Sequence, residues 1–389
     1  MDDFQIRLAH RFRKQQEFAS GSSPLYAQLY GVLADWMKAE PGRDPMVDWL
    51  VRAATGRPSF DVPLLLLAGL HRDILAGCSE VRDLARYFPS MGGTMSPQEG
   101  DIAACLRQAM CARQEPLGAF LRTATVQTNE TARGLCWLLP VLYPGWEGVH
   151  LVDLGASAGL NLVADQRQYR LIEKDTGAIL LDLGSGAPVQ FTVTGEGRFS
   201  LPPRSAPPAI WTRTGCDLAP LDLHSVHDEQ ILAAFVWGDQ LERLDMLRQG
   251  IAALHRVNRT KVPVQLHRSD LPDHLSRFLE ERISPLTDAP IVFYNTYLTT
   301  YLHDKGASLR PQLAAWAVRH PQPVLWLQWE TLWLGPKPPD FGWVGWTADL
   351  WQDGRHRQWH LAWAHPHGTW ILWLPDMADW AGFWHLDHQ

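Results

Sequence analysis

The segment Leu151–Asn161, with the sequence LVDLGASAGLN, contains the residues whose types and spacing most clearly suggest chemistry. A short apolar run ends at Asp153, and Gly155 and Gly159 follow within a few residues. Because glycine has no Cβ atom, the backbone there can turn sharply and approach a bound molecule closely. Amide groups at the start of a following helix can then meet an anionic group. The segment predicts either a cofactor-type pocket or a tight strand–helix turn that binds no ligand.

The spacing Asp-x-Gly-x-Ser-x-Gly resembles motif I of class I methyltransferases, which is usually written with three glycines. Ser157 stands where the middle glycine is expected. The spacing differs from the G-x-G-x-x-G pattern of dinucleotide-binding domains. The resemblance implies that S-adenosylmethionine is the cofactor and that the following residues contact it: Asp153, Gly155, Ala156, Ser157, Gly159 and Asn161.

Two later acids follow predicted strands. Asp217 ends the run that starts at Ala209, and an acid there can accept hydrogen bonds from both ribose hydroxyl groups. Its separation from Asp153 is longer than usual, and an insertion over about 176–208 would account for it. Asp270 lies where the methyltransferase pattern has an acid that meets the adenine amino group. The alternative for each is helix capping, by Asp217 before Pro220 and by Asp270 near Pro272.

Catalytic candidates come from two other segments. Asn295, at the end of a fourth strand, could orient a substrate together with its tyrosine neighbours, or these side chains could simply pack in the core. Gln127, Asn129 and Glu130 concentrate polar groups in an apolar region, either as a helix cap or as a lid over the cofactor. If the reaction needs a general base, Glu130 is the candidate.

Other patterns are less specific. The turn 237–243 could line the pocket edge, or Asp239 could cap a helix. The C-terminal histidines lack the spacing of a metal-ligand frame, which favours turn and surface roles and predicts no metal site. The tryptophan-rich C-terminal part could stack on a flat substrate, but core packing is favoured. There is no G-x-S-x-G elbow and no Walker motif, so neither a serine hydrolase nor a Walker-type nucleotidase is indicated.

The elements that would position these residues form two regions. Helical spacing of apolar residues predicts an all-helical N-terminal domain over residues 1–145, with a helix starting at Pro24 after Ser23. Over 146–389, alternating strands and helices predict an α/β fold with a Rossmann-like class I methyltransferase sheet that ends in a C-terminal antiparallel hairpin. The predicted strands are 149–153, 209–214, 262–267, 290–295 and 324–329, with the hairpin at 358–374. The predicted helices are 159–169, 229–235, 241–257, 271–283 and 308–320.

Composition narrows the class of protein. The chain has 389 residues, 46% of them apolar, and a net charge of −7, which argues mildly against a nucleic-acid-coating protein. Five cysteines without a C-x-x-C pair favour reduced thiols, and the N-terminus lacks the pattern of a signal peptide. The longest apolar run, 64–70, is too short to span a bilayer. We therefore expect a cytoplasmic protein that does not enter membranes.

Several of these segments together resemble one bacterial family of uncharacterised proteins, domain of unknown function 2332. The resemblance covers nearly the whole chain and rests on the segments 127–130, 155–162, 215–220 and 237–243. It implies a Rossmann-like, methyltransferase-like fold and names no substrate.

Together these observations predict an S-adenosylmethionine-dependent methyltransferase. Its methyl acceptor would be a small molecule or a protein, with nucleic acid less favoured. The alternative is a non-catalytic Rossmann-like module that binds a nucleotide-like ligand. The spacing of the glycine turn disfavours an oxidoreductase.

Overall fold

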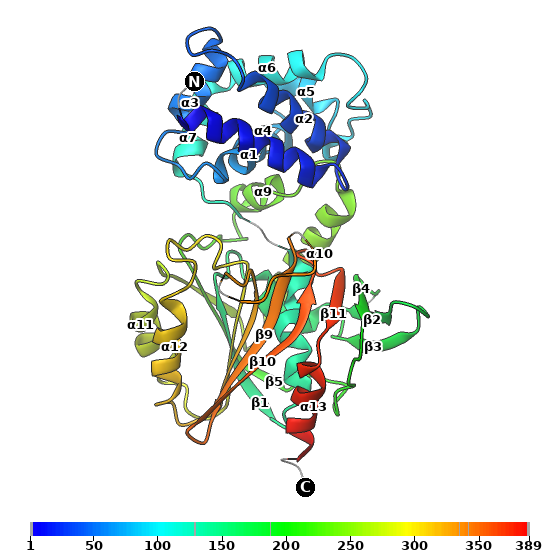
Figure 1. Ribbon diagram of the computed structural model, residues 1–389, viewed down its shortest axis with the longest axis vertical. Coiled ribbons are helices and arrows are strands. Elements are labelled where there is room, and N and C mark those ends of the chain that lie inside the picture. The colour runs from blue at the N-terminus through cyan, green and yellow to red at the C-terminus, as the bar shows by residue number, and fades with distance from the viewer. Residues whose placement is uncertain (1–2, 128–129, 187, 334, 341, 387–389) are drawn as a thin grey trace. The chain divides into compact units, whose positions relative to one another are not determined.

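The computed structural model describes residues 3–127, 130–186, 188–333, 335–340 and 342–386. The chain forms two compact units (Figure 1). One combines Met1–Thr128 with Asp222–Leu247, and the other combines Asn129–Leu221 with Arg248–Gln389. We call them the helical unit and the sheet unit. The chain passes from one to the other at three places, so neither unit is one continuous stretch of sequence.

The helical unit is built around apolar helix faces. The helix predicted to start at Pro24 is confirmed as α2 (Pro24–Trp36), and the Ser23 side chain caps it by accepting from the Tyr26 amide at 3.1 Å. The first helix, α1, packs against α2. Most of the remaining helices contribute to the same apolar cluster, which Trp237 joins from the segment after α9. The helices of this unit are α1 (Asp3–Ala19), α2, α3 (Pro45–Ala53), α4 (Asp61–Leu75), α5 (Arg82–Ala85), α6 (Ile102–Ala112), α7 (Gln114–Thr123), α9 (Val226–Ala234) and the first part of α10 (Leu241–Val257).

A half-buried carboxylate helps to explain why residues 222–247 belong to the helical unit. Asp239 accepts hydrogen bonds from Ser23 Oγ at 2.6 Å and from the Leu25 amide at 3.1 Å. Trp237 stacks on Tyr26 with ring centroids 5.2 Å apart. Asp239 therefore caps α2, the beginning of a helix more than 200 residues earlier in the chain, rather than the helix that follows it.

The sheet unit contains one mixed sheet of eleven strands in the order β3-β2-β4-β11-β10-β9-β8-β7-β1-β5-β6. The five strands predicted for the parallel part are confirmed, and they pair in parallel. The strands are β1 (Gly148–Leu154), β2 (Tyr169–Glu173), β3 (Ile179–Leu183), β4 (Phe191–Glu196), β5 (Ala209–Asp217), β6 (Val264–Arg268), β7 (Ile291–Thr296), β8 (Val324–Glu330), β9 (Val344–Gln352), β10 (Arg355–Ala364) and β11 (Trp370–Trp373).

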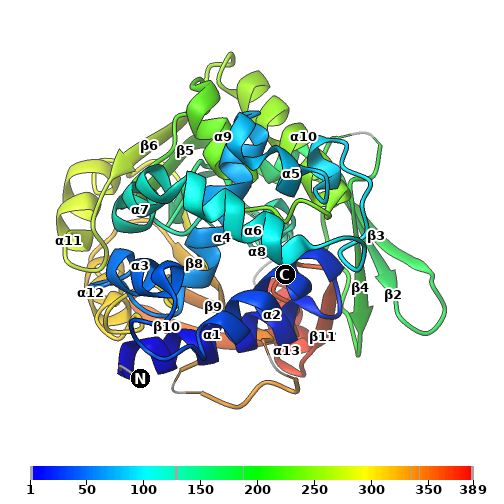
Figure 2. The same cartoon turned by 90° about the horizontal axis from the view of Figure 1, so that it is seen from above.

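The antiparallel part differs from the prediction. The hairpin between β10 and β11 is confirmed, but it does not end the sheet, because β4 pairs with β11 in parallel. The segment predicted as an insertion supplies β3 and β4, which extend the sheet together with β2 instead of lying apart from it as a surface hairpin. These strands form the end of the sheet opposite β6 (Figure 2). Strand β9, which the sequence did not indicate, lies between β8 and β10 and is antiparallel to both.

Helices pack on both faces of the sheet. On one face, α11 (Leu275–Phe278), the π-helical turn Leu279–Ile283 and α12 (Leu309–Ala317) pack on apolar residues of β1, β7 and β8. On the other face, α8 (Leu135–Leu138) lies against β7 and β8, and Trp346 of β9 donates to the Cys136 carbonyl at 3.2 Å. Several C-terminal tryptophans are fully buried in this core. Among them are Trp329 and Trp346, whose ring centroids lie 5.0 Å apart. Helix α13 (Asp376–Leu386) packs on β10.

No single helix in the described part of the chain is both long and apolar enough to cross a bilayer. Asp61–Leu75 and Ser79–Ala85 meet the length and composition limits only as a pair, across a bend of 114°.

Candidate functional site

The glycine turn follows β1 and has unusual backbone conformations. Gly155 has φ +84° and Gly159 has φ +74°, in the left-handed region that favours glycine. Ser157 also has a positive φ, 49°, although it carries a Cβ atom. The sharp turn predicted from these residues is therefore present, and Ser157 adopts a left-handed conformation that glycine favours.

Asp217, at the end of β5, holds the glycine turn in place. One carboxylate oxygen accepts from the Ser157 amide at 2.9 Å, and the other accepts from the Ala219 amide at 2.9 Å. The next helix, α9, begins only at Val226, so Asp217 does not cap it. The structure therefore brings the predicted turn and the predicted ribose acid together. Each carboxylate oxygen of Asp217 can accept more than one hydrogen bond, so each keeps capacity to accept from a ligand.

The predicted helix after the turn is wrong in type. Residues Leu160–Gln166 form a 3₁₀ segment with a kink at Val163, and β2 follows almost at once. A long α-helix would aim several amides and its dipole at a ligand, whereas this short segment does so less effectively. The turn amides also bond within the protein: those of Gly155 and Ala156 both donate to the Cys216 carbonyl.

Asp153 is a buried carboxyl group beside the turn. Burial raises the pKa of Asp153 to about 8, the nearby Tyr294 hydroxyl partly offsets this shift, and the Asp217 charge adds to it. Desolvation disfavours the carboxylate, so this side chain is protonated near neutral pH and can donate a hydrogen bond. Burial also raises the pKa of two neighbouring side chains, Cys216 and Tyr294, well above their usual ranges.

The ends of the neighbouring strands contribute three further groups. Asp270, the predicted adenine contact, is exposed, and its carbonyl accepts from the His274 amide at 2.7 Å. The preceding residue, Ser269, is buried, its amide donates to the Asp217 carbonyl at 2.8 Å, and its hydroxyl has no partner in the described structure. Sequence reasoning missed Ser269, because the acid beside it matched the expected pattern. Asn161 is half-buried, and its Oδ1 is likewise an unpaired buried acceptor.

Glu130 belongs to the sheet unit and pairs with a histidine. Its buried carboxylate contacts His367 Nδ1 at 3.1 Å, in the turn between β10 and β11. Because β10 is antiparallel to β9 and β9 to β8, this turn lies at the carboxyl edge of the parallel strands, as the glycine turn does. The neighbouring Arg133 guanidinium lies 4.4 Å from the ring centre of Tyr297, which follows β7. The pair resembles a base and the carboxylate that orients it.

The other members of the predicted polar segment are placed differently. Gln127 belongs to the helical unit, where its buried amide donates to Thr125 Oγ1 at 3.0 Å. Asn129 lies outside the described residues.

Asn295 is fully buried and bonded on both sides. Its Nδ2 donates to Glu330 Oε1 at 2.7 Å, and its Oδ1 accepts from Trp326 Nε1 at 2.7 Å. Glu330 also accepts from the amides of Leu298 and Thr299 and from the Thr299 hydroxyl, at 2.6, 3.1 and 2.7 Å. Asn295 therefore positions Glu330, and Glu330 fixes the loop after β7.

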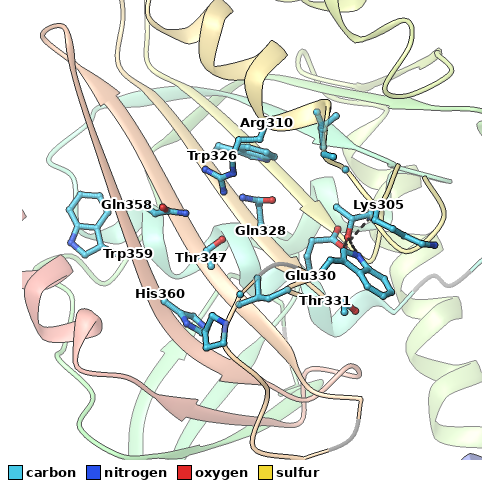
Figure 3. A pocket seen from close by; sticks show the side chains of 18 of the residues that line it. Lys305, Arg310, Trp326, Gln328, Glu330, Thr331, Thr347, Gln358, Trp359 and His360 are labelled. Atoms are coloured by element: carbon cyan, nitrogen blue, oxygen red, sulfur yellow. Dashed lines mark hydrogen bonds between the residues drawn. The ribbon is translucent and has the colours of Figure 1, made fainter. Parts of the chain in front are cut away.

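That loop lies between the glycine turn, which Leu298 contacts, and a cavity of about 820 Å³, some of whose lining residues are labelled in Figure 3. On one side of the loop, the Leu298 side chain packs against Gly155, so that a Cβ atom added there would meet it at 3.0 Å. On the other side, Thr299 and Glu330 line the cavity. The floor of the cavity is the face of β8, β9 and β10 that carries Gln328, Thr347 and Gln358, and Arg310 reaches it from α12. No sequence motif marked this cavity.

These features define a two-unit α/β protein with a mixed sheet and polar sites at and beside the carboxyl edge of its parallel strands. The chain belongs to the family described as uncharacterized proteins conserved in bacteria (DUF2332), whose family model matches residues 9–373. Neither a curated protein nor a solved structure matches the chain.

Proposed function

We propose that the protein binds S-adenosylmethionine at the glycine turn and transfers its methyl group to an acceptor of unknown identity. The observation that carries the proposal is the position of the turn in the sheet. Numbered in chain order, the parallel strands β1, β5, β6, β7 and β8 lie in the order 3-2-1-4-5, which begins the doubly wound Rossmann order. In such sheets ligands bind at the carboxyl ends of the strands where the order reverses, here between β1 and β7.

The residues around the turn suit the parts of this cofactor. Asp217 can accept from ribose hydroxyl groups with its remaining lone pairs, and the unpaired Ser269 hydroxyl can bond the adenine edge, with Asp270 at the rim. Protonated Asp153 offers a donor below the turn. Asn161 supplies an unpaired acceptor for the amino group of the methionine moiety.

The cofactor supplies an electrophilic methyl group on a sulfonium, so no covalent enzyme intermediate is needed. The chain's own part is to place the acceptor in line with that group, which accounts for much of the acceleration in such reactions. Where the acceptor must lose a proton, His367 is better suited than Glu130 to take it. Glu130 is buried and accepts from His367 Nδ1, so it would hold the imidazole in one tautomer.

The test is calorimetry on the full chain with S-adenosylmethionine, S-adenosylhomocysteine and NAD. We expect heat with both sulfur ligands and none with NAD, and at least tenfold weaker binding in Asp217→Asn. Asp222→Asn is the matched control, since its carboxylate is exposed and accepts from a local amide, that of His224, at 3.0 Å. A folded sample that gives no heat with either sulfur ligand would overturn the proposal.

A non-catalytic binding module is the second candidate. It is favoured by the engagement of the turn amides within the protein and by Leu298, which occupies the space beside Gly155. Incubating the chain with methyl-labelled S-adenosylmethionine and fractions of a bacterial extract separates the two candidates. Label transferred to any fraction supports the methyltransferase, and binding without transfer supports the module.

A further inference from the structure

The floor of the cavity is a grid of polar side chains on an interior sheet face. Strand register places Trp326, Asp349 and Gln358 side by side in one row across β8, β9 and β10. The next row contains Gln328, Thr347 and His360. Cross-strand neighbours have Cβ atoms about 5 Å apart. Interior faces are normally apolar, as this one is under α11 and α12, so a polar grid here requires an explanation.

The charged groups in and around the cavity have partners: Asp304 accepts from the Gly306 and Ser308 amides at 2.9 and 2.8 Å, and Asp376 accepts from the His360 amide at 2.8 Å. Asp349 is fully buried and binds Arg310 through two hydrogen bonds of 2.7 and 3.0 Å, with His356 at 2.9 Å. Glu330 accepts four hydrogen bonds. Lys305 donates to the Thr300 carbonyl at 2.7 Å and lies 5.1 Å from the ring centre of Trp333. A charged ligand that displaced the partners of Asp349 or Glu330 would leave a carboxylate buried and unpaired.

The groups that remain available are neutral. Thr347 and Gln358 have no hydrogen-bond partner for their side chains within the described residues, and Gln328 makes one long contact, to Asp349 at 3.5 Å. His360 Nε2 is a buried atom without a partner. Burial lowers the pKa of His360, which keeps its ring neutral at physiological pH. An unpaired buried polar atom such as His360 Nε2 is costly, so it is expected to meet a ligand or water, and the exposed Gln358 amide lies beside it on the same strand.

We infer that the cavity over β8–β10 binds a small uncharged polyol of the sugar type. Amide, hydroxyl and imidazole groups each both donate and accept, as ligand hydroxyl groups do. They are spread across three strands, which suits a molecule with hydroxyl groups around a ring better than one with a single polar edge. The partly exposed Trp333 at the rim offers an apolar face for the C–H side of such a ring. The volume, about 820 Å³, lies within the usual range for small-molecule sites.

The inference is independent of the proposed methyl transfer and is tested separately. Ligand-observed NMR on the full chain is run with myo-inositol, glucose, galactose and ribose as neutral probes, and with glucuronate and glucose 6-phosphate as charged ones. We expect at least one neutral probe to bind, and the charged analogues to bind at least tenfold more weakly.

Two variants locate the binding. Thr347→Val keeps the side-chain volume and removes the central hydroxyl, and Gln358→Leu changes an exposed position on the neighbouring strand. Each is expected to weaken polyol binding at least tenfold and to leave S-adenosylhomocysteine binding unchanged. Thr192→Val on β4 is the matched control, since Thr192 is exposed and does not line the cavity. Absence of binding by every neutral probe, a preference for the charged probes, or full binding by both variants would each overturn the inference.

Discussion

The glycine turn and the cavity floor lie on either side of one loop and differ in how their polar groups are used. At the turn, backbone amides and the Asp217 carboxylate mostly bond one another. On the floor, Thr347 and Gln358 keep their side-chain hydrogen-bonding capacity, within the part of the chain that the structure describes. A motif therefore marks where the backbone must be unusual, whereas unused hydrogen-bonding capacity marks where a ligand is expected. Both regions depend on Glu330, which fixes the loop between them.

The largest effect is expected from Glu330→Ala. The substitution leaves two loop amides, the Thr299 hydroxyl and the Asn295 amide without their acceptor, and should lower the free energy of unfolding by about 3 kcal/mol. Urea denaturation measures this loss. Glu330→Gln keeps one carbonyl acceptor and should lose less. A loss below about 1 kcal/mol in the alanine variant would show that the loop does not depend on this carboxylate.

Gly155→Ala should cost about 2 kcal/mol of stability, because it adds a Cβ atom at positive φ and presses it against Leu298. Gly177→Ala is the matched control, since Gly177 has φ +67° but nothing within 4 Å of the added atom. The difference between the two midpoints in thermal denaturation measures the contact with Leu298. Equal losses would mean that the loop yields, and that the turn is open toward β7.

The raised pKa of Asp153 predicts that the free energy of unfolding depends on pH. Its pKa is 3.8 when the side chain is exposed to solvent and about 8 in the folded chain, so the folded state binds the proton more tightly. The stabilisation is complete at low pH and is lost as pH rises from about 4 to about 8, with a slope of at most about 1.4 kcal/mol per pH unit. Comparing wild type and Asp153→Asn by denaturation at several pH values isolates this slope. Parallel curves for the two proteins would contradict the raised pKa.

The smallest effect is expected from Ser157→Gly, a gain of about 0.5 kcal/mol. Glycine removes the strain of a positive φ but costs more chain entropy on folding, so the two effects largely cancel. Differential scanning calorimetry resolves such a shift. If S-adenosylhomocysteine binds equally well to this variant, the Ser157 hydroxyl is not a cofactor contact. A loss of stability would show that the hydroxyl contributes more than the strain costs.

The parallel strands were predictable because each is a continuous apolar run bounded by turn residues. Strand β9 was not, because both of its faces are buried and polar Thr347 and Asp349 interrupt its apolar run. Arg310 pairs with Asp349, and Thr347 lines the cavity. The start of α2 after Ser23 could be predicted from neighbouring residues in the sequence. The contribution of Asp239 could not, because it depends on a contact between distant segments. Glu130 was identified as a polar group, but its histidine partner lies 237 residues away in sequence.

The three passages of the chain between the units have a consequence for how the protein can be divided. A fragment that stops at Thr128 would lack α9, Trp237 and Asp239, and would expose the apolar surface that they cover. A fragment that begins at Asn129 would retain residues 222–247 without the helices on which they pack, and Trp237 would lose its contact with Tyr26. Neither unit can be expressed or transplanted by cutting the chain at one place, because the segments of the two units alternate along the chain.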